Sequence, residues 1–339
     1  DSRLIAAVGA EIGAEMRAYA WGEKETTDVV YSRQIAKALG IPWKHIELPK
    51  DFLVRYTPQW ADLFGSSMHF HGMYLMSFLD LLKNENSGPV ISGFLGDTIT
   101  QDSFYLFDPQ SGRIYSDWSP HWHLEETRGV LRQEIDSAIN QLITQLKEEL
   151  DSIPGAPFQK FGFFEIWSRQ SFFNYFQLVL SNYWRGVAVP YLDRTFARFC
   201  ASLPRAVLGQ RRLLKAMYCR YYGKLAVIPG TYAPDPLIVM GRYLLKRRIA
   251  RILPRYLHLG PLRGFEDVQL RMDVTSIQEC GKAALWPIYE TLDELSEWVD
   301  ISQVEAAYQA AMSNREDIRP LRKLQSIQTL AYRLLDNPY

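Results

Sequence analysis

The sequence predicts an α/β fold, a parallel sheet followed by a large helical C-terminal region. In residues 1–100, short apolar runs alternate with amphipathic stretches, and strands that alternate with helices along a chain usually pair in parallel. Beyond Thr100 the apolar residues recur mainly at helical spacing. We therefore expect an α/β layer in residues 1–100 and a mainly helical continuation in residues 101–339.

The composition is that of a globular protein with no overall charge. Of the 339 residues, 47% are hydrophobic and 22% are charged, which excludes disordered and collagen-like classes. Lys and Arg number 38 and so do Asp and Glu, so the whole surface has no positive field for nucleic acid, and we expect no such partner. The three cysteines form no Cys-x-x-Cys pair, which favours a reducing compartment, the cytoplasm.

Local signals predict each element of the first hundred residues. Apolar residues at helical spacing, with small residues between them, predict a helix from Ser2. Thr26-Thr27-Asp28 supplies the N-cap of a second helix, which ends at Gly40. The other expected elements are strands at residues 16–21, 43–48 and 89–92 and helices at residues 51–64 and 73–83.

Amphipathic periodicity predicts the helices of the second part. They are expected at residues 124–150, 161–184, 194–203, 210–222, 237–253, from 276 onward, 301–312 and 320–335, after a loop at residues 101–123. No internal repeat is visible, so we expect these helices to pack over one edge of the sheet.

The segment Pro89–Gln101, PVISGFLGDTITQ, contains the most informative motif. A strand that ends in Ser-Gly, followed after two residues by Gly-Asp, places backbone N–H groups and a carboxylate at the carboxyl end of a parallel sheet, where such sheets bind ligands. Such a loop can hold a phosphate and a magnesium ion. Taken alone, the same residues fit an ordinary strand-to-loop turn equally well.

The opening Asp1-Ser2, ahead of a helix, is a second candidate anion site. Helix N-termini attract anions through their N–H groups and the macrodipole, and Ser or Asp there can contact a phosphate or metal-bound water. Taken alone, the pair is an N-cap.

The order of these segments resembles the synthetase domain of the asparagine synthase family, a branch of the N-type ATP pyrophosphatases. Asp1-Ser2 look like the last two residues of that family's Ser-Gly-Gly-x-Asp-Ser pyrophosphate loop, and Ser92-Gly93 with Asp97 look like its second loop. Residues 190–193, Pro-Tyr-Leu-Asp, are similar to its Pro-Phe-Leu-Asp. The resemblance covers most of the chain but lacks the start of the pyrophosphate loop, and the opening at Asp1 predicts a fragment of a longer protein.

The resemblance implies a sheet of the adenine-nucleotide α-hydrolase-like type and a layer, residues 1–100, that binds ATP with Mg²⁺. By the same resemblance Asp1 and Asp97 would bind the metal. The residues expected to contact the nucleotide or its phosphates are Ser2, Trp21, Ser92, Gly93 and Gly96.

Several positions depart from the family pattern and mark the chain as divergent. Phe94 stands where the family often has a Glu, and a hydrophobic side chain cannot transfer a proton. Leu95 stands where the family has a loop glycine, and Thr98 stands where it has a Glu. The position of the Lys that the family is expected to have at the reacting phosphate corresponds to a residue near Thr231. No catalytic residue is assigned for this reason.

The function implied by the resemblance is an ATP-dependent amide ligase that releases AMP and pyrophosphate and activates a carboxylate as an acyl-adenylate. The expected substrate is a small-molecule or peptide carboxylate, and the expected partner is an upstream glutaminase domain or subunit. The alternative is a catalytically degenerate module of the same family that acts as a binding or scaffold subunit. Phe94 and Thr231 favour the alternative, whereas Asp1, Asp97 and the glycines favour the enzyme.

Residues 242–255 are a basic amphipathic stretch. Its simplest interpretation is a solvated helix face, and the other is peripheral contact with an anionic membrane. The longest uncharged run, residues 63–79, contains too many polar residues to span a membrane.

Overall fold

The structure is a computed structural model that describes residues 1–22, 24, 26–65, 70–84, 88–100, 130–155, 160, 162–163, 166–167, 170–171, 175–230, 265–313 and 319–336. Four of the expectations concern residues outside these ranges. They are the loop at 101–123, the helix at 237–253, the basic stretch at 242–255, and Thr231.

The first hundred residues alternate between helices and short strands, as expected. Thr26 caps the second helix, because its Oγ1 accepts a hydrogen bond from the Val29 N–H, and Gly40 ends that helix with a left-handed φ of 71°. The elements are α1 (Ser2–Glu11), β1 (Ala18–Trp21), α2 (Thr27–Leu39), β2 (Trp43–Ile46), α3 (Phe52–Phe64), the 3₁₀ helix η1 (Phe70–Leu75), α4 (Met76–Asn84), β3 (Val90–Ile91) and α5 (Gly96–Ile99).

The second part is mainly helical, as expected. Its elements before residue 230 are α7 (Gln133–Ser152), α9 (Phe176–Arg185), β4 (Val187–Ala188), η5 (Pro190–Leu192), α10 (Arg194–Ser202), α11 (Arg205–Leu208), η6 (Gly209–Arg211), α12 (Arg212–Tyr221) and α13 (Gly223–Ala226). Its later elements are α15 (Phe265–Cys280), η7 (Gly281–Leu285), α16 (Trp286–Glu290), α17 (Leu292–Leu295), α18 (Ile301–Ser313) and α19 (Arg319–Asp336).

Three helices begin at residues other than those expected. The helix expected from residue 124 includes Leu131, which instead forms an antiparallel bridge with Val299, so α7 begins at Gln133. Helix α15 begins at Phe265, before the expected start at residue 276. Helix α12 begins after Arg211, whose left-handed backbone separates it from η6.

The strands pair in parallel, which is compatible with the expected α/β arrangement. In the described residues they form two separate pairs rather than one continuous sheet: β1 with β2, where Ala18 faces Trp43, and β3 with β4, where Val90 faces Val187. The sequence analysis did not predict β4. Because β3 and β4 come from either side of residue 100, their pairing joins the α/β layer to the helical part.

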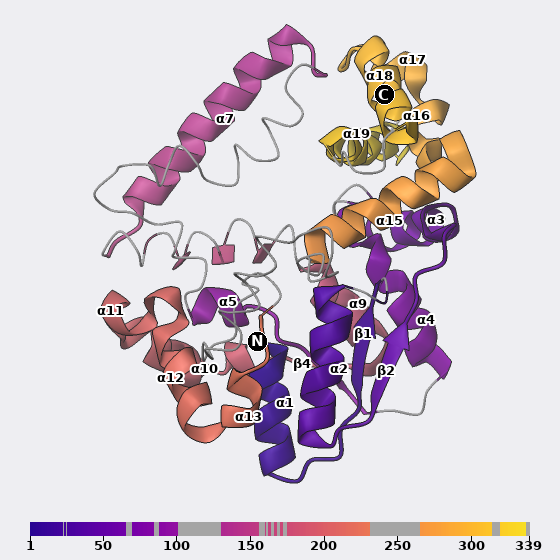
Figure 1. The fold of residues 1–339 in the computed structure, drawn as a ribbon. Coiled ribbons are helices and arrows are strands. Elements are labelled where there is room, and N and C mark those ends of the chain that lie inside the picture. The colour runs from indigo at the N-terminus through magenta and orange to yellow at the C-terminus, as the bar shows by residue number, and fades with distance from the viewer. Residues whose placement is uncertain are drawn as a thin grey trace, which may run out of the picture.

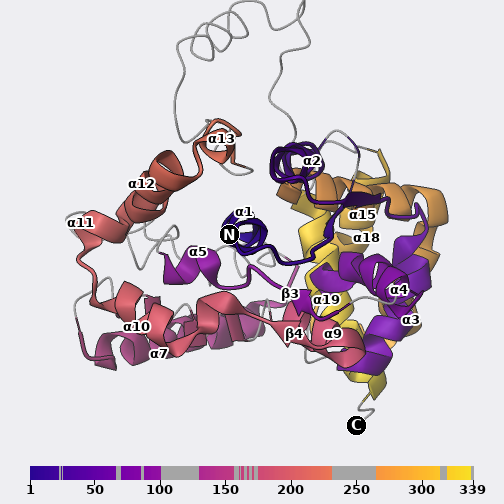
Figure 2. The same cartoon turned by 90° about the horizontal axis from the view of Figure 1, so that it is seen from below.

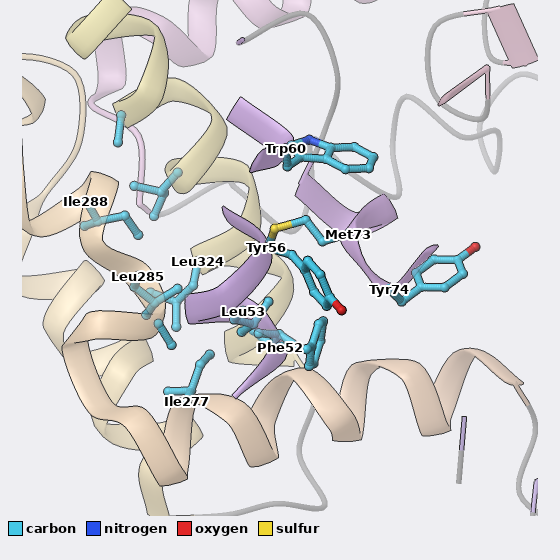
Figure 3. Close-up of a cluster of buried hydrophobic side chains, with 14 of the residues drawn as sticks. Phe52, Leu53, Tyr56, Trp60, Met73, Tyr74, Ile277, Leu285, Ile288 and Leu324 are labelled. Carbon is cyan, nitrogen blue, oxygen red and sulfur yellow. The ribbon is translucent and has the colours of Figure 1, made fainter. Parts of the chain in front are cut away.

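The main hydrophobic core lies among α3, η1, α4 and the C-terminal helices α15 to α19 (Figure 3). Trp60 and Ile277 are fully buried in it. Gly72 lets η1 approach α3, because a Cβ built on Gly72 would lie 2.4 Å from the Trp60 ring. Among the described residues, no helix has the length and apolar character needed to cross a membrane.

A second, smaller core joins α1 and α2 to α12 and α13 through residues such as Ala7, Tyr31 and Tyr218. Figures 1 and 2 both show the N-terminus beside α5, on the side of the molecule that carries α10 to α13. The C-terminal helices α15 to α19 lie above β1 and β2 in Figure 1. The N-terminus of the chain is therefore close to the loop that follows β3.

Candidate functional site

The candidate site is built on the loop of residues 92–97, which follows β3. The Ser92 N–H donates to the Ala188 carbonyl at 2.9 Å, which extends the pairing of β3 with β4 by one bond. The Ser92 hydroxyl accepts from the Phe94 N–H at 3.2 Å, and the Gly96 N–H donates to the Gly93 carbonyl at 3.0 Å. These bonds close a tight turn at the carboxyl end of the strand.

Leu95 occupies a backbone conformation that normally belongs to glycine. Its φ is 62° and its ψ is 3°, in the left-handed region, where a side-chain-bearing residue is disfavoured by roughly 1–2 kcal/mol. The Leu95 side chain is only 5% exposed, so burial of its apolar surface offsets this cost. In the family pattern described above, a loop glycine stands at the position of Leu95.

Asp1 and Ser2 pack directly on the glycines of this loop. A Cβ built on Gly93 would lie 2.9 Å from the Ser2 nitrogen, and one built on Gly96 would lie 2.6 Å from Asp1 Cβ and Cγ. Both separations are shorter than real Cβ contacts, so only glycine allows the two segments to meet this closely. The structure thus brings together Asp1, Ser2, Gly93 and Gly96, which the sequence analysis assigned to one site.

Tyr191 holds this junction from the side of η5. Its hydroxyl donates to the Asp1 carbonyl at 3.0 Å, and its Cε2 atom lies 2.8 Å from the Cβ that would be built on Gly96. Burial raises the pKa of Tyr191 above its usual value, and Tyr218 raises it further while the Arg211 guanidinium lowers it. Tyr191 therefore stays neutral and acts as a hydrogen-bond donor at physiological pH.

Asp97 is the second carboxylate of the site. It is half-buried, and its Oδ1 accepts hydrogen bonds from the Thr98 N–H at 2.8 Å and from the Thr98 hydroxyl at 3.4 Å. Asp97 follows Gly96, the glycine that packs against Asp1, so the two carboxylates belong to the same loop junction. The expected pairing of Asp1 with Asp97 is compatible with this arrangement.

Arg211 is a residue of the site that the sequence analysis missed. Its Nη1 lies 3.2 Å from Asp1 Oδ1, and the two side chains are 20% and 22% exposed. Its backbone is left-handed, with a φ of 54° and a ψ of 32°. In the sequence Arg211 is one of two adjacent arginines after Gly209, a pattern that also fits a solvated helix start, so no local signal distinguishes it.

Trp21, the remaining predicted residue, has different surroundings. Its indole packs against Phe78 and Tyr74, with ring centroids 5.4 and 6.2 Å apart, beside the main core. In the described part of the chain, its ring contacts do not include the loop of residues 92–97. Its Nε1 atom is buried without a hydrogen-bond partner, which leaves an unused donor at the carboxyl end of β1.

The carboxylate oxygens at this site are suited to a magnesium ion whose other ligands are phosphate oxygens and water. Carboxylate oxygens are the ligands that Mg²⁺ prefers, and it commonly takes one or two of them together with phosphate oxygens and water. Within the described ranges, no group of three or more His, Cys, Asp or Glu residues could hold a metal by itself. Asp1 and Asp97 are the two carboxylates at this site whose oxygens could contribute to such an ion.

Comparison of the chain with protein-family models, and with curated proteins, found no match.

Proposed function

We propose that the residues around Asp1 and Asp97 bind the phosphates and the magnesium ion of ATP. On this proposal the chain is an ATP-dependent amide ligase, similar to the synthetase domain of the asparagine synthase family, with an adenine-nucleotide α-hydrolase-like fold. Its substrates are a small-molecule or peptide carboxylate and an amine. An associated glutaminase domain or subunit would supply the amine. The three cysteines, free of disulfides, support a cytoplasmic location.

The observation that carries the proposal is the close approach of Asp1 and Ser2 to Gly93 and Gly96. A loop of small residues at the carboxyl end of a parallel strand is a favourable place for a phosphate, because backbone N–H groups can reach its oxygens. Helix α1 begins at the same point, and the side chain of its N-cap residue, Asp1, makes no capping hydrogen bond to its first turn. The start of α1 and the loop of residues 92–97 thus meet beside the Asp1 carboxylate.

The proposed reaction has two steps. A carboxylate oxygen of the substrate attacks the α-phosphorus of ATP, the bond to the β-phosphate oxygen breaks, and pyrophosphate leaves. The amine nitrogen then attacks the acyl carbon, the bond from that carbon to the AMP oxygen breaks, and the nitrogen loses a proton. Magnesium, when bound, offsets the negative charge of the phosphates. Asp1 and Asp97 would hold the metal, and the backbone around Ser2 and Gly93 would bind phosphate oxygens.

A degenerate binding module is the second candidate. Phe94 offers no group that could transfer a proton, and Arg211 already neutralises the Asp1 carboxylate. Such a module would bind magnesium ATP without releasing pyrophosphate.

One experiment separates the two candidates. The protein is incubated with ATP, Mg²⁺, a panel of carboxylates and hydroxylamine, and released pyrophosphate is measured alongside binding of magnesium ATP by calorimetry. A ligase releases pyrophosphate only when a suitable carboxylate is present, whereas a module binds ATP and releases none. Asp97→Asn should weaken the binding of magnesium ATP, and the control Asp62→Asn, an exposed carboxylate on α3, should leave it unchanged. Absence of ATP binding in the unmodified protein would contradict both candidates.

A further inference from the structure

Helices α10 to α13 carry a surface of basic side chains. Residues 190–230, which contain these helices, have eight Lys or Arg residues and one acidic residue, although the whole chain has no net charge. Figures 1 and 2 both show the four helices together on one side of the molecule. Six of the basic side chains are exposed, and we call them the basic surface: Arg194, Arg198, Arg212, Lys215, Arg220 and Lys224.

The charge of the basic surface is not balanced by nearby carboxylates. Within the described ranges, no carboxylate forms an ion pair with any of its six side chains. Asp193, the acidic residue of this region, caps α10 by accepting a hydrogen bond from the Phe196 N–H at 2.9 Å. Residues 281–313, in contrast, have six acidic residues and one basic residue, and they lie at the other end of the molecule (Figure 1). Charge segregated in this way attracts and orients an acidic partner.

Large apolar side chains are exposed among these cations. Phe199 on α10 is 51% exposed and Tyr221 at the end of α12 is 65% exposed, and Leu192 and Val227 are exposed as well. The Arg220 guanidinium lies 5.3 Å from the centroid of the Tyr221 ring. Arginine and aromatic side chains are enriched where proteins bind one another. Because aliphatic side chains gain little from phosphates, the mixture favours a polypeptide with acidic and apolar residues over a nucleic acid.

The basic surface adjoins the candidate site. Helix α10 follows η5, whose Tyr191 donates a hydrogen bond to the Asp1 carbonyl, and α10 also contacts α5. Helix α12 begins directly after Arg211, which forms the ion pair with Asp1. A peptide bound along α10 and α12 would therefore lie beside the place where the proposed function activates a carboxylate.

We propose that the basic surface binds an acidic peptide, so that a peptide rather than a small molecule is the carboxylate substrate. This role as substrate rests on the proposed function, whereas the docking itself does not. Exposed ion pairs are individually weak, but several of them add up along one peptide, and a guanidinium binds a carboxylate with two-point geometry. Apolar side chains of the peptide would cover Phe199 and Tyr221. Binding should therefore depend on the charge of the peptide and weaken as salt screens it.

The test measures the fluorescence anisotropy of a labelled peptide composed of Glu, Leu and Phe, without ATP. Its counterpart has Gln in place of every Glu, so that only the charge differs. We expect the acidic peptide to bind roughly tenfold more tightly than its counterpart. Raising the salt concentration from about 0.05 M to about 0.5 M should remove most of this difference, because the Debye length falls.

A matched pair of double variants locates the binding. Arg194→Glu with Arg198→Glu reverses two cations four residues apart on α10 and should weaken binding of the acidic peptide roughly tenfold or more. Arg194 begins α10, where an acidic side chain favours the helix dipole, so this variant should fold. Arg33→Glu with Lys37→Glu reverses two exposed cations at the same spacing on α2 and should leave the affinity unchanged. Thermal unfolding of both variants verifies that they are folded.

Three results would assign the basic surface to something else and overturn the inference. An equal loss in the two double variants would show a general effect of charge. Tighter binding of a single-stranded oligonucleotide or of phosphatidylserine vesicles, lost in the α10 variant, would show that the surface binds phosphates. Self-association at low salt that the α10 variant abolishes would place the acidic helices α16 to α18 of a second copy there.

Failure of this inference and failure of the proposed function are distinguishable. If both peptides bind equally or not at all, the inference is wrong, and the proposed function still stands on the binding of magnesium ATP. If the acidic peptide binds and magnesium ATP does not, the proposed function fails. In that case the docking surface stands, and its role in delivering a substrate is overturned.

Discussion

The main core and the candidate site differ in how their residues are held. In the core, α3 packs on α15, η1 and η7 through apolar side chains that are almost wholly buried, with Trp60 and Ile277 as examples. At the site, the contacts are made by glycines, a tyrosine hydroxyl and an ion pair, and two residues adopt left-handed backbones. The core gains stability from apolar burial, whereas the site retains strain and partly buried charge.

This difference shows where the protein retains strained backbone and partly buried charge. Leu95 and Arg211 would have a lower conformational energy in a right-handed or extended backbone conformation. The Asp1 carboxylate would be better solvated at the surface. Such costs persist when a ligand or a close packing requirement maintains them. The core has no comparable function to preserve, so substitutions there should act on stability alone.

The largest effect is expected from Trp60→Ala in the core. The Trp60 side chain is fully buried against Phe64 and Phe176, so its loss leaves a cavity and should lower the free energy of unfolding by about 3–5 kcal/mol. Denaturant unfolding measures this value. Affinity for magnesium ATP, measured on the protein that remains folded, should not change. A loss of affinity comparable to that of Asp97→Asn would show that the core and the site are not separable.

Gly96→Ala tests the close approach at the site. The new Cβ would lie 2.6 Å from Asp1 and 2.8 Å from the Tyr191 ring, so Asp1 must move, and we expect a loss of about 1–3 kcal/mol of stability. Gly223→Ala is the matched control, since nothing lies within 4 Å of a Cβ built there. Unlike Trp60→Ala, Gly96→Ala should also weaken the binding of magnesium ATP. Stability and affinity equal to those of the control would contradict the packing of Asp1 on the loop.

Asp28, at the start of α2, should make stability depend on pH. Burial raises its pKa from 3.8 to about 6, so the folded state holds its proton more tightly than the unfolded chain does. The contribution of Asp28 to stability should therefore be greatest below about pH 4, fall as pH rises toward 6, and stay level above that value. Asp28→Asn should remove this dependence and stabilise the protein by about 1–2 kcal/mol at pH 8, with no gain at pH 4. Thermal unfolding at the two pH values checks this, and an equal gain at both would contradict it.

Leu95 allows the smallest but most specific comparison. Leu95→Ala and Leu95→Gly both remove a buried side chain, but only glycine accepts the left-handed backbone without strain. We expect Leu95→Gly to be more stable than Leu95→Ala by about 1 kcal/mol, the reverse of their order at an ordinary helical position. Denaturant unfolding of the two variants measures the difference. The ordinary order, with alanine more stable, would show that the strain is absent.

Local sequence signals predicted much of the fold and part of the site. Thr26 and Gly40 delimit α2 as expected, and the segment from Pro89 to Asp97 contains the strand, the turn and the carboxylate that the structure describes. What the sequence could not indicate depends on residues distant along the chain. The contact of Arg211 with Asp1, the pairing of β4 with β3, and the bridge of Leu131 with Val299 all depend on tertiary packing rather than on local periodicity.

The central claim, that magnesium and phosphates bind where Asp1 meets the loop of residues 92–97, has a direct test. Manganese replaces magnesium in a titration with ATP, and its paramagnetic broadening of the backbone amide signals is followed by nuclear magnetic resonance. We predict that the amides of Ser2, Gly93 and Asp97 broaden first, while those of α18 and α19 in the main core stay sharp. Broadening that begins in the core helices, or that leaves the amides of the loop unaffected, would contradict the account.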